Sequence, residues 1–259
     1  MSLTLTPLPG IPLVQPGDDL TELIWASCKR ANITLQDGDI LVLAQKIVSK
    51  AEGRLVNLAD VTPSPAAQEL AAASEKDPRL CELILRESNE VLRTRPGLVI
   101  VEHKLGFVCA NAGIDHSNVS PPPVGKGPGV EEWYLLLPED PDASADRIRA
   151  ALEAISGARL GVLTIDSHGR AWREGTVGVT IGLSGLPAVM DERGWHDLFG
   201  YELRVTVVGV ADELAAAASL MMGQAAEGTP VVHARGFPYP LAEGRLGDLL
   251  RPREKDLFR

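Results

Sequence analysis

Two nearly continuous apolar runs, at residues 40–44 and 160–165, constrain the fold of this chain most. Both consist largely of leucine and β-branched residues, which is typical of strands. A strand with one solvated face alternates apolar and polar residues, whereas a strand without a polar face is covered on both sides. The two runs therefore predict strands that are buried from both faces.

The remaining strand signals are unevenly spaced along the chain. They predict strands at residues 98–101, 107–110, 177–183 and 203–210. In the last of these, apolar residues alternate with Arg204 and Thr206, which predicts a half-covered strand. Because the strands cluster instead of alternating regularly with helices, a doubly wound parallel sheet is not indicated. The predicted fold class is α+β, with mixed sheets and packed helices.

Helix starts are marked by capping side chains. An aspartate at position 18 or 19 precedes a helical apolar pattern, and Ser64 and Asp77 each precede a proline at a first helical position. The two helices that follow these prolines are expected to pack as a pair. Two more helices are predicted at about residues 144–155 and 211–222, each ending at a glycine.

Charge and cysteine usage exclude several classes of protein. The chain has 25 Lys and Arg against 35 Asp and Glu, a net charge of −10, which argues against nucleic-acid binding. Cys28, Cys81 and Cys109 lie far apart, which predicts neither a disulfide framework nor a zinc site. Since the first basic residue is Lys29 and the apolar tracts are short, no signal peptide and no membrane span is expected. We therefore expect a cytoplasmic protein.

Two aspartates follow predicted strands. Asp115 comes shortly after residues 107–110, and Asp166 comes directly after residues 160–165. Carboxylates at neighbouring strand ends can share hard cations that clamp a phosphate, with phosphate oxygens and water completing the coordination. The alternative for Asp115 is an Asx-turn, in which the carboxylate bonds to the backbone nearby.

Two arginines and a histidine near Asp166 each have more than one interpretation. Arg170 and Arg173 can pair with phosphate or a substrate carboxylate, or can merely offset the aspartates or lie in water. His168 is either a ligand or base, or a histidine in a surface turn.

Two further segments and a loop are candidates for ligand contact. Lys50 follows the strand at residues 40–44 and can reach a phosphate, although no Walker loop is present. The glycine-punctuated segment 222–229 either wraps a ligand or closes its helix. The Pro- and Gly-rich stretch 121–129 is a mobile lid or a passive connection.

Read together, five separated motifs resemble the coenzyme F420-0:γ-glutamyl ligase family in order and spacing. They are residues 9–13, 47–53, 111–118, 166–170 and 211–213 ahead of Met222-Gly223. The resemblance spans nearly the whole chain, so residues 1–259 are expected to form one ligase domain, without the nitroreductase-like domain fused to some bacterial relatives.

The resemblance implies a GTP-dependent amide ligase. Such an enzyme adds L-glutamate residues, successively γ-linked, to the lactyl-phosphate tail of F420-0 through an acyl phosphate. It also implies two Mg²⁺ or Mn²⁺ ions per site, K⁺ as an additional candidate, and an intertwined homodimer with a family-specific fold. The rivals are a related nucleotide-dependent carboxylate–amine ligase with another substrate, and a non-catalytic nucleotide-binding module.

Site residues follow from the matched positions. The implied catalytic residues are Lys50, Asp115 and Asp166. The implied metal ligands are Asp115, Asp166, Ser167 and Gln224. Gln224 stands where an acidic ligand is expected in archaeal relatives, and a neutral amide oxygen coordinates more weakly. The nucleotide site is implied to comprise Gly10, Ile11, Pro12, Leu13, Gln45, Lys46, Lys50, Asn118, Met222, Gly223, Gln224, Ala225, Ala226, Glu227, Gly228 and Thr229.

Overall fold

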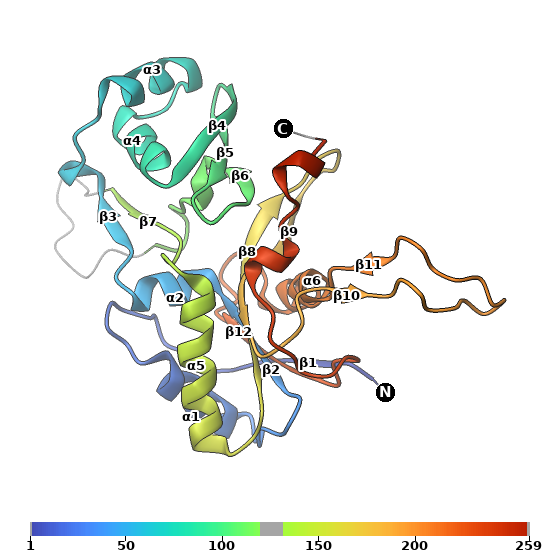
Figure 1. The fold of residues 1–259 in the computed structure, drawn as a ribbon. Coiled ribbons are helices and arrows are strands. Elements are labelled where there is room, and N and C mark those ends of the chain that lie inside the picture. The colour runs from blue at the N-terminus through green and yellow to red at the C-terminus, as the bar shows by residue number, and fades with distance from the viewer. Residues whose placement is uncertain (1, 120–131, 258–259) are drawn as a thin grey trace.

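A mixed sheet forms the centre of the molecule (Figure 1). The computed structural model describes residues 2–119 and 132–257, so the Pro- and Gly-rich stretch lies outside the described residues. The strand order is β1-β12-β2-β8-β9. Strands β2 and β8 are parallel, and the other neighbours pair antiparallel. The strands are β1 (Thr4–Pro7), β2 (Ile40–Ala44), β8 (Gly161–Gly169), β9 (Thr176–Ser184) and β12 (Val231–Arg235).

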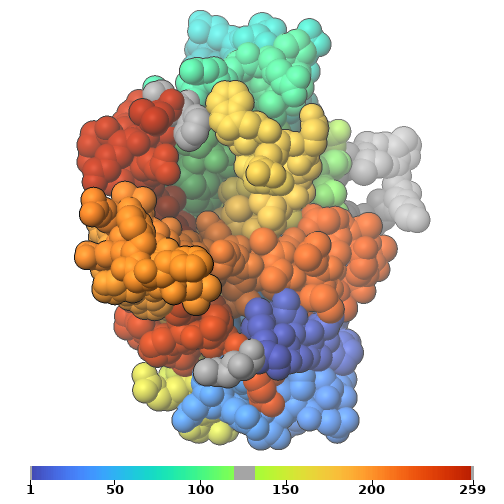
Figure 2. Space-filling model, turned by 90° about the vertical axis from the view of Figure 1, so that its right-hand side faces the viewer, coloured from blue at the N-terminus to red at the C-terminus, as the bar shows by residue number. Residues whose placement is uncertain are grey.

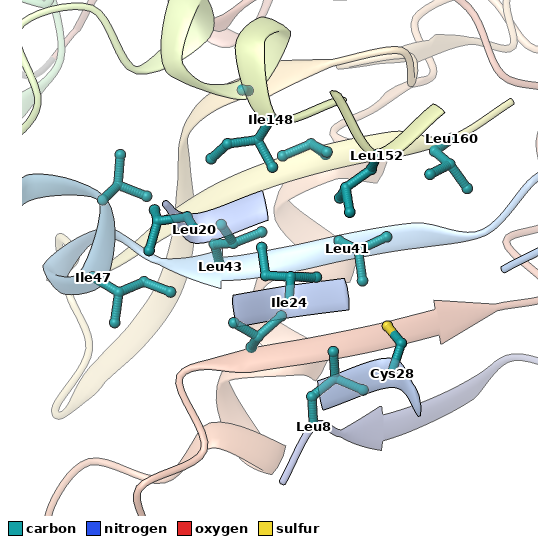
Figure 3. Packing of buried hydrophobic residues seen from close by; sticks show 14 of the residues in the cluster. Leu8, Leu20, Ile24, Cys28, Leu41, Leu43, Ile47, Ile148, Leu152 and Leu160 are labelled. Atoms are coloured by element: carbon teal, nitrogen blue, oxygen red, sulfur yellow. The ribbon is translucent and has the colours of Figure 1, made fainter. Parts of the chain in front are cut away.

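Helices cover both faces of this sheet, as the two apolar runs predict. Leu41 and Leu43 of β2 pack with one cluster, which Figure 3 shows, under α1 (Leu20–Arg30), α2 (Gln45–Ala51) and α5 (Pro141–Ser156). Ile40 and Val42 point to the opposite face and pack with α6 (Val210–Met222). Because successive side chains of a strand alternate between faces, β2 contributes to two cores at once.

A second group of elements forms a small lobe at the top of Figure 1. We define the small lobe as α3 (Pro65–Ser74), α4 (Pro78–Arg86), β4 (Ser88–Arg95), β5 (Leu98–His103) and β6 (Val108–Ala110). Strands β4, β5 and β6 pair antiparallel, and α3 packs against α4 as predicted. Strands β3 (Leu55–Asn57) and β7 (Trp133–Leu135) pair between this lobe and the central sheet.

The predicted capping residues begin their helices. Asp19 accepts hydrogen bonds from the backbone N–H groups of Thr21 and Glu22 and so caps α1. Ser64 and Asp77 accept bonds from the first turns of α3 and α4, and a proline follows each cap. The prediction for α5 was wrong at its start, since this helix begins at Pro141 after the cap Asp140. The caps of α1, α3 and α4 bond to backbone groups within one helical turn, which is why the sequence reveals them.

The strand predicted at residues 203–210 is wrong. Only Val207–Val208 is a strand there, β11, and it pairs with β10 (Met190–Asp191). We call residues 190–208 the arm; it projects away from the rest of the molecule in Figure 1 and stands out from the surface in Figure 2. The apolar alternation does not reflect a covered face, because the Val205 side chain is exposed.

Several other elements lacked a local signal and were not predicted. They are β1, β3, β4, β7, β12, α2 and the short pieces α7 (Leu246–Leu249), η1 (Leu58–Asp60), η2 (Asn111–Gly113) and η3 (Arg253–Lys255). All three cysteines are buried free thiols. Among the residues that the structure describes, no helix is both long and apolar enough to cross a bilayer.

Candidate nucleotide and metal site

A cavity of about 440 Å³ opens beside the ends of β2 and β8. Because these strands are parallel, their carboxyl ends lie at one edge of the sheet, where ligands of α/β proteins commonly bind. The volume of the cavity falls within the range of small-molecule sites, roughly 300–1,000 Å³. The walls come from residues 11–14, the first turns of α2, the end of β8 and residues 222–230.

The cavity gathers most of the residues implied by the family motifs. The predicted residues that line it are Ile11, Pro12, Leu13, Gln45, Lys46, Lys50, Asn118, Asp166, Ser167, Met222, Gly223, Gln224, Ala225, Ala226, Glu227, Gly228 and Thr229. Gly10 and Asp115 are not among the lining residues. Asp115 nevertheless contacts the wall directly through Gln45 and Lys46.

Asp115 lies at the junction of the small lobe and the central sheet. Its backbone pairs with Leu135, and its carboxylate accepts a hydrogen bond from Gln45 Nε2 at 2.6 Å and forms an ion pair with Lys46. The carboxylate thus bonds to α2 and does not act as the local turn that was the alternative interpretation. Burial raises the pKa of Asp115 and the charge of Asp166 raises it further, which outweighs the lowering by Lys46.

Asp166 lies inside β8, not in a turn after it. β8 continues to Gly169, whereas β2 ends at Ala44 opposite Ile165, so Asp166 is the first residue beyond the edge of its parallel neighbour. Burial tends to raise the pKa of Asp166, but the hydrogen bond and charge of His168 outweigh it, and the pKa lies below the usual range.

The expected relation between the two aspartates needs correction. Asp115 follows β6 and η2, which belong to the small lobe, whereas Asp166 belongs to the central sheet. They are therefore not at the ends of neighbouring strands of one sheet. The charge of Asp166 nevertheless raises the pKa of Asp115, and Lys46 lowers the pKa of both, which indicates that the lobe and the sheet bring the two carboxylates near each other.

The oxygen-bearing side chains here fit a hard divalent cation. Ser167 Oγ donates to Gln224 Oε1 at 3.0 Å, which brings a hydroxyl and an amide oxygen together beside Asp166. Within residues 2–119 and 132–257, no group of three or more His, Cys, Asp and Glu is arranged to hold a metal ion. Two carboxylates with neutral oxygens suit Mg²⁺ or Mn²⁺, because such ions take the remaining ligands from phosphates and water.

Lys50 connects three segments at the cavity wall. Its ammonium group donates to the Asn118 backbone oxygen at 2.7 Å, and Asn118 Nδ2 donates to the Ala225 oxygen at 3.0 Å. Burial and the nearby charge of Lys46 lower the pKa of Lys50. Two lysines on successive turns of α2 thus face the cavity, where they can neutralise an anionic ligand.

The segment after α6 curls over the cavity. Gly223 has φ of 71°, and an added Cβ would overlap the Glu227 carboxyl group, so glycine is required. Glu227 Oε2 accepts from the Ala225 N–H at 2.8 Å, and Thr229 Oγ1 donates to the Met222 oxygen at 3.1 Å. These bonds fold the segment so that it forms one wall of the cavity. The segment therefore does more than end the helix α6.

Some participants were not found from sequence. Ser27 Oγ donates to the Pro9 oxygen at 2.5 Å and Arg30 Nη1 donates to the Gly10 oxygen at 2.8 Å, which attaches the first cavity loop to α1. Further lining residues that were not among the predicted site residues are Val14, Ala44, Ile47, Ile165, Ser219 and Pro230. Their part in the cavity follows from packing, which a motif does not reveal.

The two arginines after His168 lie on the exposed turn between β8 and β9. Arg170 Nη1 donates to the Gly175 oxygen at 3.0 Å and thereby closes this turn. His168 differs from the surface-turn interpretation, because it lies within β8 and is only 12% exposed.

The fold and the cavity define an α+β protein whose candidate site combines two lysines with carboxylate and amide oxygens, a set compatible with an anionic ligand and a divalent cation. A family model described as F420-0:Gamma-glutamyl ligase matches residues 10–236. The coenzyme F420:L-glutamate ligase of Methanothermobacter thermautotrophicus is 46% identical, covering 100% of both chains. The ligases of that name from Methanopyrus kandleri and Archaeoglobus fulgidus are 45% and 43% identical, each covering 100% of this chain and 98% and 97% of their own lengths.

The chain belongs to the F420-0:γ-glutamyl ligase family. It is therefore a ligase, and the resemblance carried by the five motifs is confirmed.

Proposed function

We propose that this protein joins L-glutamate to coenzyme F420-0 at the expense of GTP, adding successive γ-linked residues. The observation that carries the proposal is the convergence of Asp115, Asp166, Lys46 and Lys50 at one cavity of a chain in this family. The relatives are named for the same coupling of glutamate to the coenzyme.

GTP is assigned to the cavity of about 440 Å³. The loop at residues 11–14 and the segment 222–230 supply its apolar and backbone walls, and Lys46 and Lys50 face the same space. Ammonium groups at this position attract the phosphate chain, whose negative charge the acidic protein otherwise repels.

The reaction proceeds in two steps. The coenzyme carboxylate attacks the γ-phosphorus of GTP, so a C–O–P linkage forms, the bond to the β-phosphate oxygen breaks, and GDP leaves. The amine of glutamate then attacks the carbonyl carbon of this acyl phosphate, a C–N bond forms, and inorganic phosphate and a proton are released. Activation is needed because direct amide formation from a carboxylate in water is unfavourable.

The residues stabilise charge on the transferred group. Asp115, Asp166 and Ser167, with Gln224 as a weaker neutral ligand, would hold Mg²⁺ or Mn²⁺. Such ions neutralise phosphate oxygens when bound. Lys50 supplies a fixed positive charge from α2, and its bond to Asn118 holds it beside the segment 222–230. No protein nucleophile is invoked.

Mass spectrometry tests the proposal. Purified protein is incubated with F420-0, GTP, L-glutamate and Mn²⁺, and the product is examined for successive glutamate additions. We expect additions by the wild type, and none by D115A or D166A that remain folded by circular dichroism. Phosphate release with another acid but no new F420 product would favour the rival ligase. Nucleotide binding without phosphate release would favour the binding module.

We further propose that the protein is a homodimer in which the arm contacts a second copy. Leu198, Phe199 and Val205 of the arm are 99%, 94% and 87% exposed. A hairpin whose strands have only two residues is poorly stable alone in water. Exposure of these large apolar side chains to water is also unfavourable. A second copy that covers these side chains would remove the unfavourable exposure.

Light scattering after size-exclusion chromatography tests the dimer. The double variant L198K/F199K is expected to run as a monomer, because buried lysines would oppose the contact. Helix α5, which carries the exposed Ile155, lies apart from the arm in Figure 1, so I155K is the matched control and should stay dimeric. A wild type that is monomeric at all concentrations would refute the proposal.

A further inference from the structure

His168 lies within the motif at residues 166–170, next to a predicted metal ligand, but is not one of the site residues that the resemblance implies. Its Nε2 is 3.0 Å from Asp166 Oδ2, and both side chains are only 12% exposed. A carboxylate accepts hydrogen bonds, so Nε2 must carry the proton and donate it. The bond therefore fixes one oxygen of the Asp166 carboxylate.

The His168 ring is itself held in place by the small lobe. The ring of Phe107 lies 5.2 Å from that of His168, tilted by 52°, and stacks at 5.2 Å on the other side with His103. His103 is buried, and its Nδ1 accepts the Leu105 N–H at 3.0 Å. Three rings in sequence thus connect the turn before β6 with Asp166 on β8.

The Phe107 turn is rigid enough to act as a support. The His103 N–H donates to the Phe107 oxygen at 2.9 Å, and the Gly106 N–H donates to the His103 oxygen at 2.8 Å. Burial lowers the pKa of His103 to about 4, so this ring is neutral near pH 7 and packs as an apolar surface. The lobe therefore presents a fixed ring face to His168.

We infer that His168 is a positioning residue, which orients the Asp166 carboxylate for the cation and the nucleotide and is itself oriented by Phe107. Groups that hydrogen-bond to metal ligands commonly fix the direction of their lone pairs, and their loss weakens metal binding. This inference rests on the proposed function, since it assigns Asp166 to the metal. It adds that the small lobe sets the geometry of the metal site on the central sheet.

Two variants separate the hydrogen bond from the ring. H168F keeps an aromatic ring against Phe107 but removes the donor. H168Q places an amide N–H near the position of Nε2 but removes the ring. If His168 positions Asp166, H168F should lose Mn²⁺ affinity and H168Q should keep most of it. A merely structural role predicts the reverse order, because only H168Q loses the aromatic contact.

The measurement is the titration of Mn²⁺ by electron paramagnetic resonance, with and without GTP, on the full-length chain. We expect H168F to bind Mn²⁺ about tenfold more weakly than the wild type, with H168Q close to the wild type. Thermal melting without metal should show one cooperative transition for H168F, as for the wild type, which checks that its fold is intact.

The outcomes separate this inference from the proposed function. If wild type and H168F bind Mn²⁺ equally, the positioning role is refuted, while the ligase assignment stands. If H168Q loses as much affinity as H168F, a direct ligand role replaces the positioning role, and nitrogen coupling in the Mn²⁺ spectrum would show it. If the wild type binds no Mn²⁺ with GTP present, the metal role of Asp166 fails and the inference fails with it.

Discussion

The ammonium group of Lys46 pairs with the carboxylate of Asp115, although the two residues come from different parts of the fold. Lys46 lies in the first turn of α2, just after the end of β2, and Asp115 follows the last strand of the small lobe. Gln45 donates to the same Asp115 oxygen at 2.6 Å. The first turn of α2 therefore supplies both the cation and the hydrogen bond that hold Asp115 beside the cavity.

Replacing this cation should destabilise the metal-free protein. In K46M, Asp115 is left partly buried near Asp166 without its partner, and its pKa rises further. We expect the free energy of unfolding, measured with urea and EDTA at pH 7, to fall by about 1–2 kcal/mol. The difference from the wild type should fade at acidic pH, because protonated Asp115 no longer needs the cation. K104M, at an exposed lysine of the small lobe, should leave the stability unchanged.

Two glycines of the segment 222–229 differ in how well they tolerate a side chain. Gly223 and Gly228 have φ of 71° and 69°, which strains alanine at both, and Gly223 combines this φ with a ψ of −175°, a conformation essentially restricted to glycine. Only at Gly223 would the new Cβ overlap Glu227, whereas the space around Gly228 is open. G223A should therefore weaken binding of a fluorescent GTP analogue far more than G228A. Equal binding by the two variants would contradict the assigned role of this wall.

Contacts from α1 should control nucleotide affinity through the loop at residues 9–13. Arg30 donates to the Gly10 oxygen, and Ser27 donates to the Pro9 oxygen. R30A should raise KM for GTP by about tenfold, since one charge-assisted bond contributes roughly 1.5 kcal/mol or more, with little change in kcat. R30K should recover part of the affinity. The steady-state rates with varied GTP check this, and a lower kcat at unchanged KM would contradict it.

A buried ionic cluster at the start of β2 predicts acid sensitivity. Burial tends to raise the pKa of Asp39, but the hydrogen bonds from Arg235 and the nearby His233, whose Nε2 is 2.9 Å from Asp39 Oδ2, hold it at about 2. Since the unfolded carboxyl titrates near 3.8, this contribution to stability is present above that pH and is lost as the pH falls toward 2.

The loss should amount to about 2 kcal/mol of unfolding free energy between pH 5 and pH 2. Urea unfolding across this range measures it. D39N should be less stable at pH 7 and should lack this part of the pH dependence. A wild type and D39N with parallel pH profiles would show that Asp39 does not cause the acid sensitivity.

Local signals in the sequence predicted the elements that form without distant partners. The caps at Asp19, Ser64 and Asp77 and the apolar run of β2 were found where the structure has them. Each depends on neighbouring residues or on composition within a few positions. The motifs also selected residues that converge on one cavity, although their chemical roles remain predictions.

Elements that depend on long-range pairing were missed or misread. β12 lies between β1 and β2 because it pairs with β2 over about 190 positions and with β1 over more than 220, which no local pattern encodes. Residues 203–210 have an alternating pattern, but no layer covers Val205, so the arm lacks the predicted strand. Likewise, the sequence around His168 resembles a turn. In the structure, His168 lies within β8 and pairs with Val177 of β9.

The sequence by itself determined the family, the α+β class, the starts of α1, α3 and α4 and the two-sided burial of the central strands, because these follow from short-range chemistry and motif order. Only the tertiary structure decided that Asp115 comes from the small lobe and Asp166 from the sheet, and that Lys46 and His168 hold them. Such relations depend on how separate elements pack, and packing is settled by the whole chain at once.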